Sequence, residues 1–416
     1  MKRIFFPLLA VIVSLAAGYS IISIWRGISL YQINLSQETL LRATRLASSN
    51  PDPYYRLGLF HQWELRHIDL KESAYYFRKA IERNPLEQDY WLNLAKIYQR
   101  MGESTLSQRA SENAISVFPT GYRGRWVIGN LHLQQGDLEK ALPHFSYILV
   151  YYPNQSAMVY DVLRKAVNDP DFVLERIVPK DPSSFKQYLS YLYETGDKDA
   201  ARRTWARRSS FGYQPDRGET LRHIEFLISK NEFNEAFQVW KARLREEGLP
   251  APEDSNLITN GGFEKEKILG GGFDWKIEKV SGAEASFDPS IAYEGKHSLK
   301  IVFNGKENVD FSHVYQFVPL KSNTEYVLKA NMKTQTVTTK SGLKIEVSGV
   351  GPTFHGVSET LTGDNEWREL IVTFRTLSQS QGGLVRIRRE KTDKFDRFIS
   401  GTVWIDNVSL KETKTH

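Results

Sequence analysis

The sequence contains no cysteine among its 416 residues, and this absence removes several classes of protein. Without thiols the chain has no disulfide framework, zinc–thiolate site, cysteine nucleophile or lipid-modified N-terminal cysteine. Charge of one sign is also scarce, because 55 Lys and Arg against 49 Asp and Glu leave a formal net charge of +6. Over this length the excess is too dilute to indicate a nucleic-acid partner.

The short motifs that carry catalytic chemistry are missing as well. The sequence has no G-x-S-x-G elbow, no H-E-x-x-H, no G-x-x-x-x-G-K-[ST] phosphate loop and no G-x-G-x-x-G fingerprint. The run Gly270-Gly271-Gly272 does not fit the last pattern and predicts a flexible turn. A pair of glycosidase carboxylates leaves no local signature, so a glycoside-acting enzyme stays as the least favoured interpretation.

Long hydrophobic runs are absent, with one exception at the N-terminus. The segment from Ile4 to Ile24 is 21 residues long and carries no charge, and Lys2 and Arg3 precede it. As a helix it matches a hydrocarbon core of about 30 Å, and its basic flank predicts a cytoplasmic N-terminus. We therefore expect residues 1–30 to form a signal anchor or transmembrane helix, with the rest of the chain outside the cytoplasm.

The alternative for this segment is a cleaved signal peptide. Ala16, Ala17 and Gly18 form a patch of small residues that a signal peptidase accepts. Apolar residues nevertheless continue through Ile21 and Ile24, beyond the usual signal core of about 7–15 residues. This length favours a retained helix over cleavage.

A regular helical repeat follows the apolar segment. Pro85, Pro119 and Pro153 are evenly spaced, and each closes a helical phrase, namely FRKAIERNP, SENAISVFP and FSYILVYYP. Equivalent positions hold the pairs Leu57-Gly58, Leu94-Ala95 and Ile128-Gly129. The pattern resembles the tetratricopeptide repeat, in which small residues let two helices approach and proline ends the second helix. The resemblance is clear to Pro153 and looser beyond it, and we expect five or six helical hairpins over residues 35–249.

This resemblance also implies a protein-binding surface. In the family, the first helices of the hairpins line a concave groove that binds protein segments. Carried over by register, the groove residues are Tyr55, Gln62, Trp63, Lys96, Gln99, Arg100, Trp126 and Asn130. Packing between adjacent repeats is the alternative role for Trp63 and Trp126. His61 and His132 are interpreted as packing residues, because no cluster of metal ligands accompanies them.

The character of the sequence changes after Leu249. Residues 250–255 predict a linker, and residues 256–413 alternate in six strand-like runs, HSLKIVF, EYVLKANMKT, GLKIEVSG, WRELIVTFRT, LVRIRRE and GTVWIDNVSLKE. Strands at this spacing without helices predict an antiparallel sandwich. The opening phrase NLITNGGFE and the closing phrase WIDNVSL resemble galactose-binding-like jelly rolls, particularly carbohydrate-binding modules. The expected fold is thus multidomain: a transmembrane helix, an all-α superhelix and an all-β jelly-roll sandwich.

Sugar binding in such a module requires exposed aromatic rings beside polar groups, because a pyranose stacks on a ring while its hydroxyls form hydrogen bonds. The candidates by residue type are Trp275, Tyr293, Tyr315, Phe354, His355, Arg386 and Arg388. Phe354 and His355 lie in a glycine-rich loop and are expected to be exposed, whereas Trp367 is expected in the core. Arg386 and Arg388 share one strand face, which predicts contact with an anionic polysaccharide or protein, or else a solvated face.

The resemblance further implies a structural Ca²⁺ ion held by Glu264 and Asp406, at the first and last strand phrases. The alternative is a pair of hydrogen-bonding acids that tie those strands together. No other cofactor is expected.

Together the modules imply a non-enzymatic envelope scaffold, anchored once in a bacterial inner membrane with its bulk in the periplasm. The repeats would hold an envelope protein, and the jelly roll a glycan or another envelope component, in surface polysaccharide assembly or export. The alternative is a protein–protein scaffold without sugar affinity. No nucleic-acid partner is expected.

Overall fold

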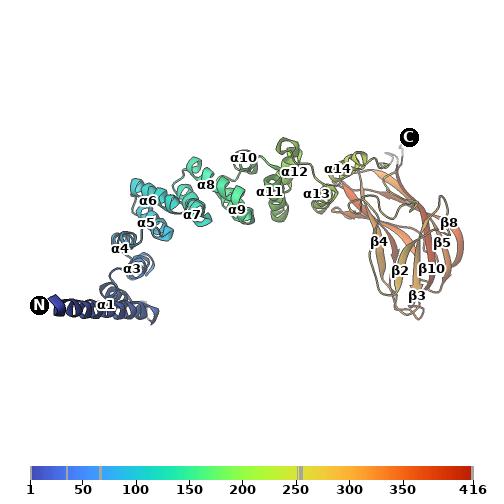
Figure 1. Cartoon of the computed structure of the whole chain (residues 1–416). Coiled ribbons are helices and arrows are strands. Elements are labelled where there is room, and N and C mark those ends of the chain that lie inside the picture. Colours follow the sequence, from blue (N-terminus) through green and yellow to red (C-terminus); the bar gives the residue numbers. More distant parts are fainter. Residues whose placement is uncertain (1, 34–35, 65–67, 251, 253–255, 414–416) are drawn as a thin grey trace. The chain divides into compact units, whose positions relative to one another are not determined.

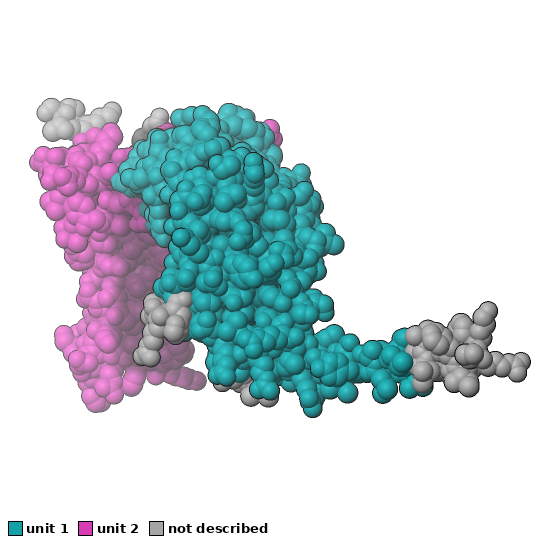
Figure 2. Space-filling model, turned by 90° about the vertical axis from the view of Figure 1, so that its left-hand side faces the viewer, with its two compact units in different colours: residues 1–213 teal, residues 214–416 magenta. Residues whose placement is uncertain are grey.

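The computed structural model describes residues 2–33, 36–64, 68–250, 252 and 256–413. The chain folds as two compact units, residues 1–213 and residues 214–416 (Figure 2). The first is all-helical, whereas the second combines two helices with a β-sandwich (Figure 1).

The first unit begins with one long apolar helix, α1 (Lys2–Ile33), which packs against α2 (Gln37–Leu46). Within α1, Ala10–Leu30 is long and apolar enough to cross a membrane, as a membrane span or a signal sequence would be. The Ser23 hydroxyl donates a hydrogen bond of 2.8 Å to the Leu46 carbonyl. Gly27 is buried, and a Cβ there would lie 2.8 Å from the Cβ of Ala47. The absence of a side chain at 27 therefore permits the close approach of α1 to α2.

Three helical hairpins follow with the expected period. They are α3 (Asp52–Trp63) with α4 (Leu70–Arg83), α5 (Gln88–Arg100) with α6 (Ser104–Val117), and α7 (Tyr122–Gln134) with α8 (Leu138–Tyr151). Gly58 of α3 faces the ring of Phe77, and Gly129 of α7 faces the ring of Phe145. Both phenylalanines are fully buried. The small residues of the repeat thus admit an aromatic ring between paired helices.

The helices after Pro153 are less regular. They are α9 (Ser156–Val167), α10 (Pro170–Arg176), α11 (Pro182–Thr195) and α12 (Lys198–Ala206). The helix α10 is short; it starts at Pro170 with Asp169 as its cap. Tyr160 and Tyr188 fill the space beside it, with ring centroids 4.9 Å apart.

The second unit contains α13 (Arg217–Ser229), α14 (Phe233–Glu246) and an antiparallel sandwich. The "β4 sheet" has the order β1 (Lys276–Ile277), β4 (Phe311–Pro319), β9 (Gly382–Arg389), β6 (Lys344–Val350), β7 (His355–Val357). The "β10 sheet" has the order β2 (Ala283–Asp288), β3 (Ser298–Asn304), β10 (Ser400–Glu412), β5 (Glu325–Val337), β8 (Gly363–Arg375). Alternate residues such as Ile345, Ile387 and Leu328 form the buried core between the sheets.

The helices α13 and α14 pack directly against the sandwich. Phe233 and Trp240 of α14 are fully buried in one cluster with Leu269, Phe273 and Phe317 of the β-domain. The loop that carries Leu269 and Phe273 is shaped by Asp274, whose carboxylate accepts backbone N–H groups of the loop. The two compact units divide between residues 213 and 214, so α13 and α14 belong to the unit that holds the sandwich. The expected linker 250–255 lies mostly outside the described residues and stays a prediction.

Candidate binding sites

The first helices of the three regular hairpins form a groove of about 570 Å³ in the first unit. It is lined by Gln62, Trp63, Lys96, Gln99, Arg100, Trp126, Val127, Asn130, Leu131 and Gln134. We call this surface the groove. Of the residues carried over by register, all except Tyr55 lie in it, because helices one repeat apart present equivalent positions to the same side.

The groove combines aromatic rings, cations and unpaired amide oxygens. Trp63 is 67% exposed, whereas Trp126 is half-buried and packs edge-on against Phe145. Gln62 is 2% exposed, and its Oε1 has no hydrogen-bond partner in the described part of the chain. Lys96 and Arg100 supply positive charge, and none of the described lining residues is a carboxylate. Burial, followed by the nearby Arg123, lowers the pKa of Lys96.

Tyr55 is the carried-over residue that does not line the groove. Its ring packs between Phe77 and Tyr90, with centroids 5.7 and 4.8 Å away, and its hydroxyl accepts a hydrogen bond from Asn93. Burial raises the pKa of Tyr55, with a smaller contribution from Asp89. Its role is therefore packing between repeats. His61 is also a packing residue, because its buried ring stacks on Tyr76 at 5.6 Å.

The second candidate site is the outer side of the β4 sheet. Strand pairing aligns Lys276, Tyr315, Arg386, Glu346 and Val357 in one row across its five strands. Arg388 lies two positions further along β9, so its side chain points to the same side. We call this surface the sheet face. Four of the expected sugar-binding residues share it, namely Tyr315, His355, Arg386 and Arg388.

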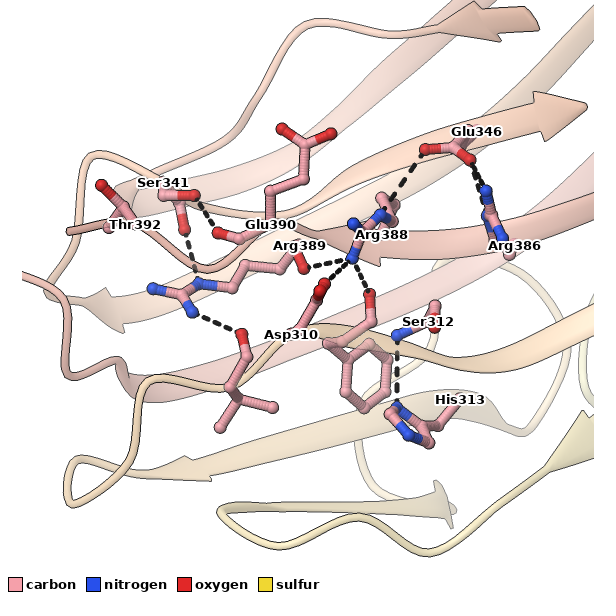
Figure 3. Close-up of polar contacts among 12 residues, drawn as sticks. Asp310, Ser312, His313, Ser341, Glu346, Arg386, Arg388, Arg389, Glu390 and Thr392 are labelled. Carbon is pink, nitrogen blue, oxygen red and sulfur yellow. Dashed lines mark hydrogen bonds and ion pairs between the residues drawn. The ribbon is translucent and has the colours of Figure 1, made fainter.

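Glu346 is the centre of charge on the sheet face, and Figure 3 shows it between the two arginines. The carboxylate is 2% exposed and accepts a hydrogen bond of 2.6 Å from Arg386 Nε. Its other oxygen lies 3.7 Å from Arg388 Nε and 3.5 Å from His355 Nε2. Arg388 also pairs with Asp310. Both arginines are therefore neutralised within the chain, which weakens the expectation of an anionic ligand for them.

Glu346 was not among the residues predicted from the sequence, although Ile345 and Val347 on either side of it are apolar and predict that it faces outward. The alternation of LVRIRRE did place Arg386 and Arg388 on one side. The pairing of β6 with β9 decides which acid lies opposite these arginines. This register was not predictable, because strands far apart in the sequence leave no local signal of it.

Tyr315 supplies the aromatic ring of the sheet face. Its hydroxyl donates a hydrogen bond of 2.7 Å to Glu278, and burial together with this acid raises the pKa of Tyr315 to about 12. Its ring lies 5.9 Å from that of Phe317, which in turn contacts Phe233 of α14. A side chain at Gly382 would overlap the Phe233 ring. Thus α14 covers one end of the sheet face and forms a wall beside Tyr315.

The remaining sugar-binding candidates do not join this surface. Trp275 is 8% exposed, and its indole N–H donates to the Asn260 carbonyl, so it is not a free platform. Phe354 is half-buried and stacks on Phe374 at 5.3 Å, which corrects the expectation that its loop exposes it. Tyr293 is 44% exposed but packs against Trp367 of the β10 sheet.

Glu264 and Asp406 lie close together and bind backbone groups of the same loop. One Glu264 oxygen accepts the N–H groups of Lys296 and His297, and one Asp406 oxygen accepts those of Tyr293 and Glu294. Asp406 is fully buried, and burial raises its pKa, with a smaller contribution from Glu264.

These hydrogen bonds give both carboxylates partners without a cation. Ca²⁺ takes about 6–8 oxygen ligands, and no group of three or more His, Cys, Asp or Glu suited to a metal occurs in the described ranges. The two acids alone do not form a calcium shell, and calcium binding stays a prediction.

Two parts of the chain match family models. Residues 255–394 match the carbohydrate binding domain, and residues 92–156 match the tetratricopeptide repeat. These matches confirm the expected modules. Together with the helices and the two antiparallel sheets, they confirm the expected order of an apolar helix, an all-α region and a jelly-roll sandwich. Both modules are of non-catalytic kinds.

Individual relatives cover only parts of the chain. The solved structure of a family 16 carbohydrate binding module is 22% identical over 37% of this chain and 99% of its own, with a TM-score of 0.28. The crystal structure of MamA is 21% identical over 35% of this chain and 85% of its own, also with a TM-score of 0.28. The tRNA nuclease WapA of Bacillus subtilis (strain 168) is 24% identical over 166 residues, 38% of this chain and 7% of its own length. The chain therefore spans a small fraction of such curated relatives.

Proposed function

We propose that this protein is a membrane-attached scaffold of a bacterial envelope, whose groove holds a protein segment and whose sheet face binds a glycan. The observation that carries the proposal is the presence of two separate lined surfaces, one in each module. A role in surface polysaccharide assembly or export agrees with the combination of modules.

For the groove, the chemistry favours an extended protein segment with acidic side chains. Lys96 and Arg100 lack a carboxylate among the lining residues, so an acidic partner would complement their charge. The accessible amides of Asn130 and Gln134 in the lining are suited to backbone groups, which an extended segment offers at regular intervals. Exposed Trp63 would pack on an apolar side chain of the partner.

This part is tested by capture of envelope proteins on the full chain held in nanodiscs. Trp63→Ala combined with Arg100→Ala should lower capture at least tenfold and leave the helical circular-dichroism signal unchanged. Arg109→Ala is the matched control, because Arg109 is exposed on α6 outside the groove. Equal capture by the double variant and the control would contradict the groove as the binding surface.

For the sheet face, the chemistry favours a neutral glycan. The ion pairs of Glu346 with Arg386 and of Arg388 with Asp310 leave little net charge, yet they offer donors and acceptors to sugar hydroxyls. Tyr315 provides the ring for stacking, and its bond to Glu278 holds that ring in place.

A glycan array probed with residues 214–416 tests this part. Tyr315→Ala and Glu346→Gln should each weaken binding at least tenfold, whereas Tyr293→Ala, which alters the other sheet, should not. Absence of binding by the unaltered unit would favour the second candidate function, a protein–protein scaffold without sugar affinity. That alternative is favoured by the internal neutralisation of both arginines.

The membrane attachment rests on the apolar part of α1. We expect alkaline phosphatase fused after His416 to be active, because the enzyme matures only outside the cytoplasm. Mass spectrometry of the purified membrane protein should find the intact Met1 peptide. An inactive fusion would contradict the orientation, and a new N-terminus near Gly18 would show that the segment is a cleaved signal.

A further inference from the structure

A second cavity of about 650 Å³ lies in the first unit, between α6, α7 and α8. Its walls include Ser111 and Ile115 of α6, Arg125, Ile128 and His132 of α7, and His144 of α8. None of its lining residues belongs to the groove. We call it the α6–α8 cavity.

The register of the repeat explains why this hairpin leaves a cavity. Ser111 stands where the neighbouring hairpins have Phe77 and Phe145, both of which are fully buried. Arg125 stands where the preceding hairpin has Trp91. The two are structurally equivalent, because Trp91 donates a hydrogen bond to the Pro85 carbonyl and Arg125 donates one to the Pro119 carbonyl. A small and a polar residue therefore replace two large aromatic ones.

The cavity has an apolar wall and unpaired polar atoms. Ile115, Ile128 and two prolines provide the apolar surface. Arg125 Nε, His132 Nδ1 and His144 Nδ1 are buried without a hydrogen-bond partner in the part of the chain that the structure describes. Buried polar atoms of this kind are costly unless a ligand or water pairs with them.

Of the two cations in the cavity lining, Arg125 is the one that lacks a counterion among the described residues. Its guanidinium lies 4.4 Å from the centre of the Tyr147 ring, and no ion pair joins it to a carboxylate among the described residues. The other charged lining groups have partners of their own, since Lys140 pairs with Asp137, Glu139 pairs with Arg176, and Glu112 accepts a hydrogen bond from Gln108. The Arg125 guanidinium is therefore the group that a negatively charged ligand would complement.

We infer that the α6–α8 cavity binds a small amphiphile, with an apolar body against Ile115 and Ile128 and one anionic group at Arg125. The volume falls in the usual range of small-molecule sites, about 300–1,000 Å³, and such sites combine apolar walls with few convergent polar groups. An aromatic acid and a short fatty acid share this chemistry. The inference is independent of the proposed function.

Two probes distinguish an aromatic acid from a short fatty acid as the ligand: naphthalene-2-sulfonate and octanoate. Binding to the full chain in nanodiscs is measured by calorimetry, with empty nanodiscs as the blank. At least one probe should bind with one-to-one stoichiometry, and the probe that binds identifies an aromatic or an acyl ligand.

Three variants locate the binding. Ser111→Phe restores the aromatic residue of the register and should weaken binding at least tenfold, whereas Ser111→Ala leaves the cavity open and should bind as the unaltered chain does. Arg125→Met keeps an unbranched apolar side chain but removes the charge, and it should also weaken probe binding at least tenfold. Thermal unfolding confirms that each variant folds.

Lack of binding by both probes would mean that only water fills the cavity and would overturn the inference, as would equal binding by Ser111→Phe. Equal binding by Arg125→Met would overturn the assignment of an anionic group.

Discussion

At the scale of single residues, the sandwich depends on an arginine that has no carboxylate as its hydrogen-bond partner among the described residues. Arg389 is fully buried, and its guanidinium donates to the carbonyls of Ser341, Val309 and Arg397 and to the side chain of Asn308. It thereby joins three loops at one end of the sandwich. Burial lowers the pKa of Arg389.

We predict that Arg389→Met strongly destabilises the second unit. Buried carbonyls left without a donor cost about 1–3 kcal/mol each, so the loss should amount to several kcal/mol. Urea unfolding of residues 214–416 measures it. Arg375→Met, at an exposed position of β8, is the control and should change the unfolding free energy by about 0.5 kcal/mol or less. Similar curves for both variants would contradict this role.

The histidine pair of the α6–α8 cavity makes a second prediction at this scale. Burial, followed by Arg125 and His132, lowers the pKa of His144 to about 4, below an unfolded value of about 6.5. The unfolded chain therefore takes up a proton first as the pH falls. The stability present above pH 6.5 is lost between about pH 6.5 and 4, by up to about 1.4 kcal/mol per pH unit for one histidine.

The check is urea unfolding of the full chain at pH 7.5, 6 and 5, followed through the helical signal. His144→Gln should flatten the dependence only in part, since burial also lowers the pKa of His132, whose ring stacks on His144 at 5.9 Å. An unchanged slope in His144→Gln would show that other groups dominate.

At the scale of elements, the helices were more predictable than the strands. The repeat from α3 to α8 was visible in sequence because helix spacing, small residues and prolines are local signals. The strand β4, FSHVYQFVP, was missed although it alternates, and with it the position of Tyr315 on the sheet face. Docking of α14 on the sandwich was not predictable, because it depends on contacts between distant parts of the sequence, such as Phe233 with Phe317.

This docking predicts the stability of truncated proteins. Residues 214–416 should unfold cooperatively, whereas residues 254–416 should be less stable by several kcal/mol, because Phe273, Leu269 and Phe317 would lose their apolar cover. Thermal unfolding compares the two. Gly382→Val in the longer protein should reproduce part of the loss, since a side chain there displaces Phe233. Equal melting temperatures for the two lengths would show that α13 and α14 are dispensable.

At the scale of the whole second unit, Glu264 near the start of the β-domain and Asp406 in its last strand bind one loop, and calcium binding there stays a prediction. An ion that binds only the folded state stabilises it by about 2.7 kcal/mol at a hundredfold excess over its dissociation constant. Glu264→Gln should erase that gain. The check is the melting temperature of the unit in EDTA and in millimolar Ca²⁺. Identical temperatures would contradict calcium binding and would show that the two acids act only by hydrogen bonding to the backbone.

For the whole molecule, the contacts of Ser23 with Leu46 and of Gly27 with Ala47 fix the direction of α2 relative to α1. In a chain anchored as proposed, α1 is a rigid support for α2, because one unbroken helix carries both the apolar segment and these contacts. Each residue of an α-helix turns the chain by about 100°. One alanine inserted before Ser23 would therefore rotate α2 by about a quarter turn around the axis of α1. The number of residues between the membrane and Ser23 thus sets the direction in which α2 leaves the anchor.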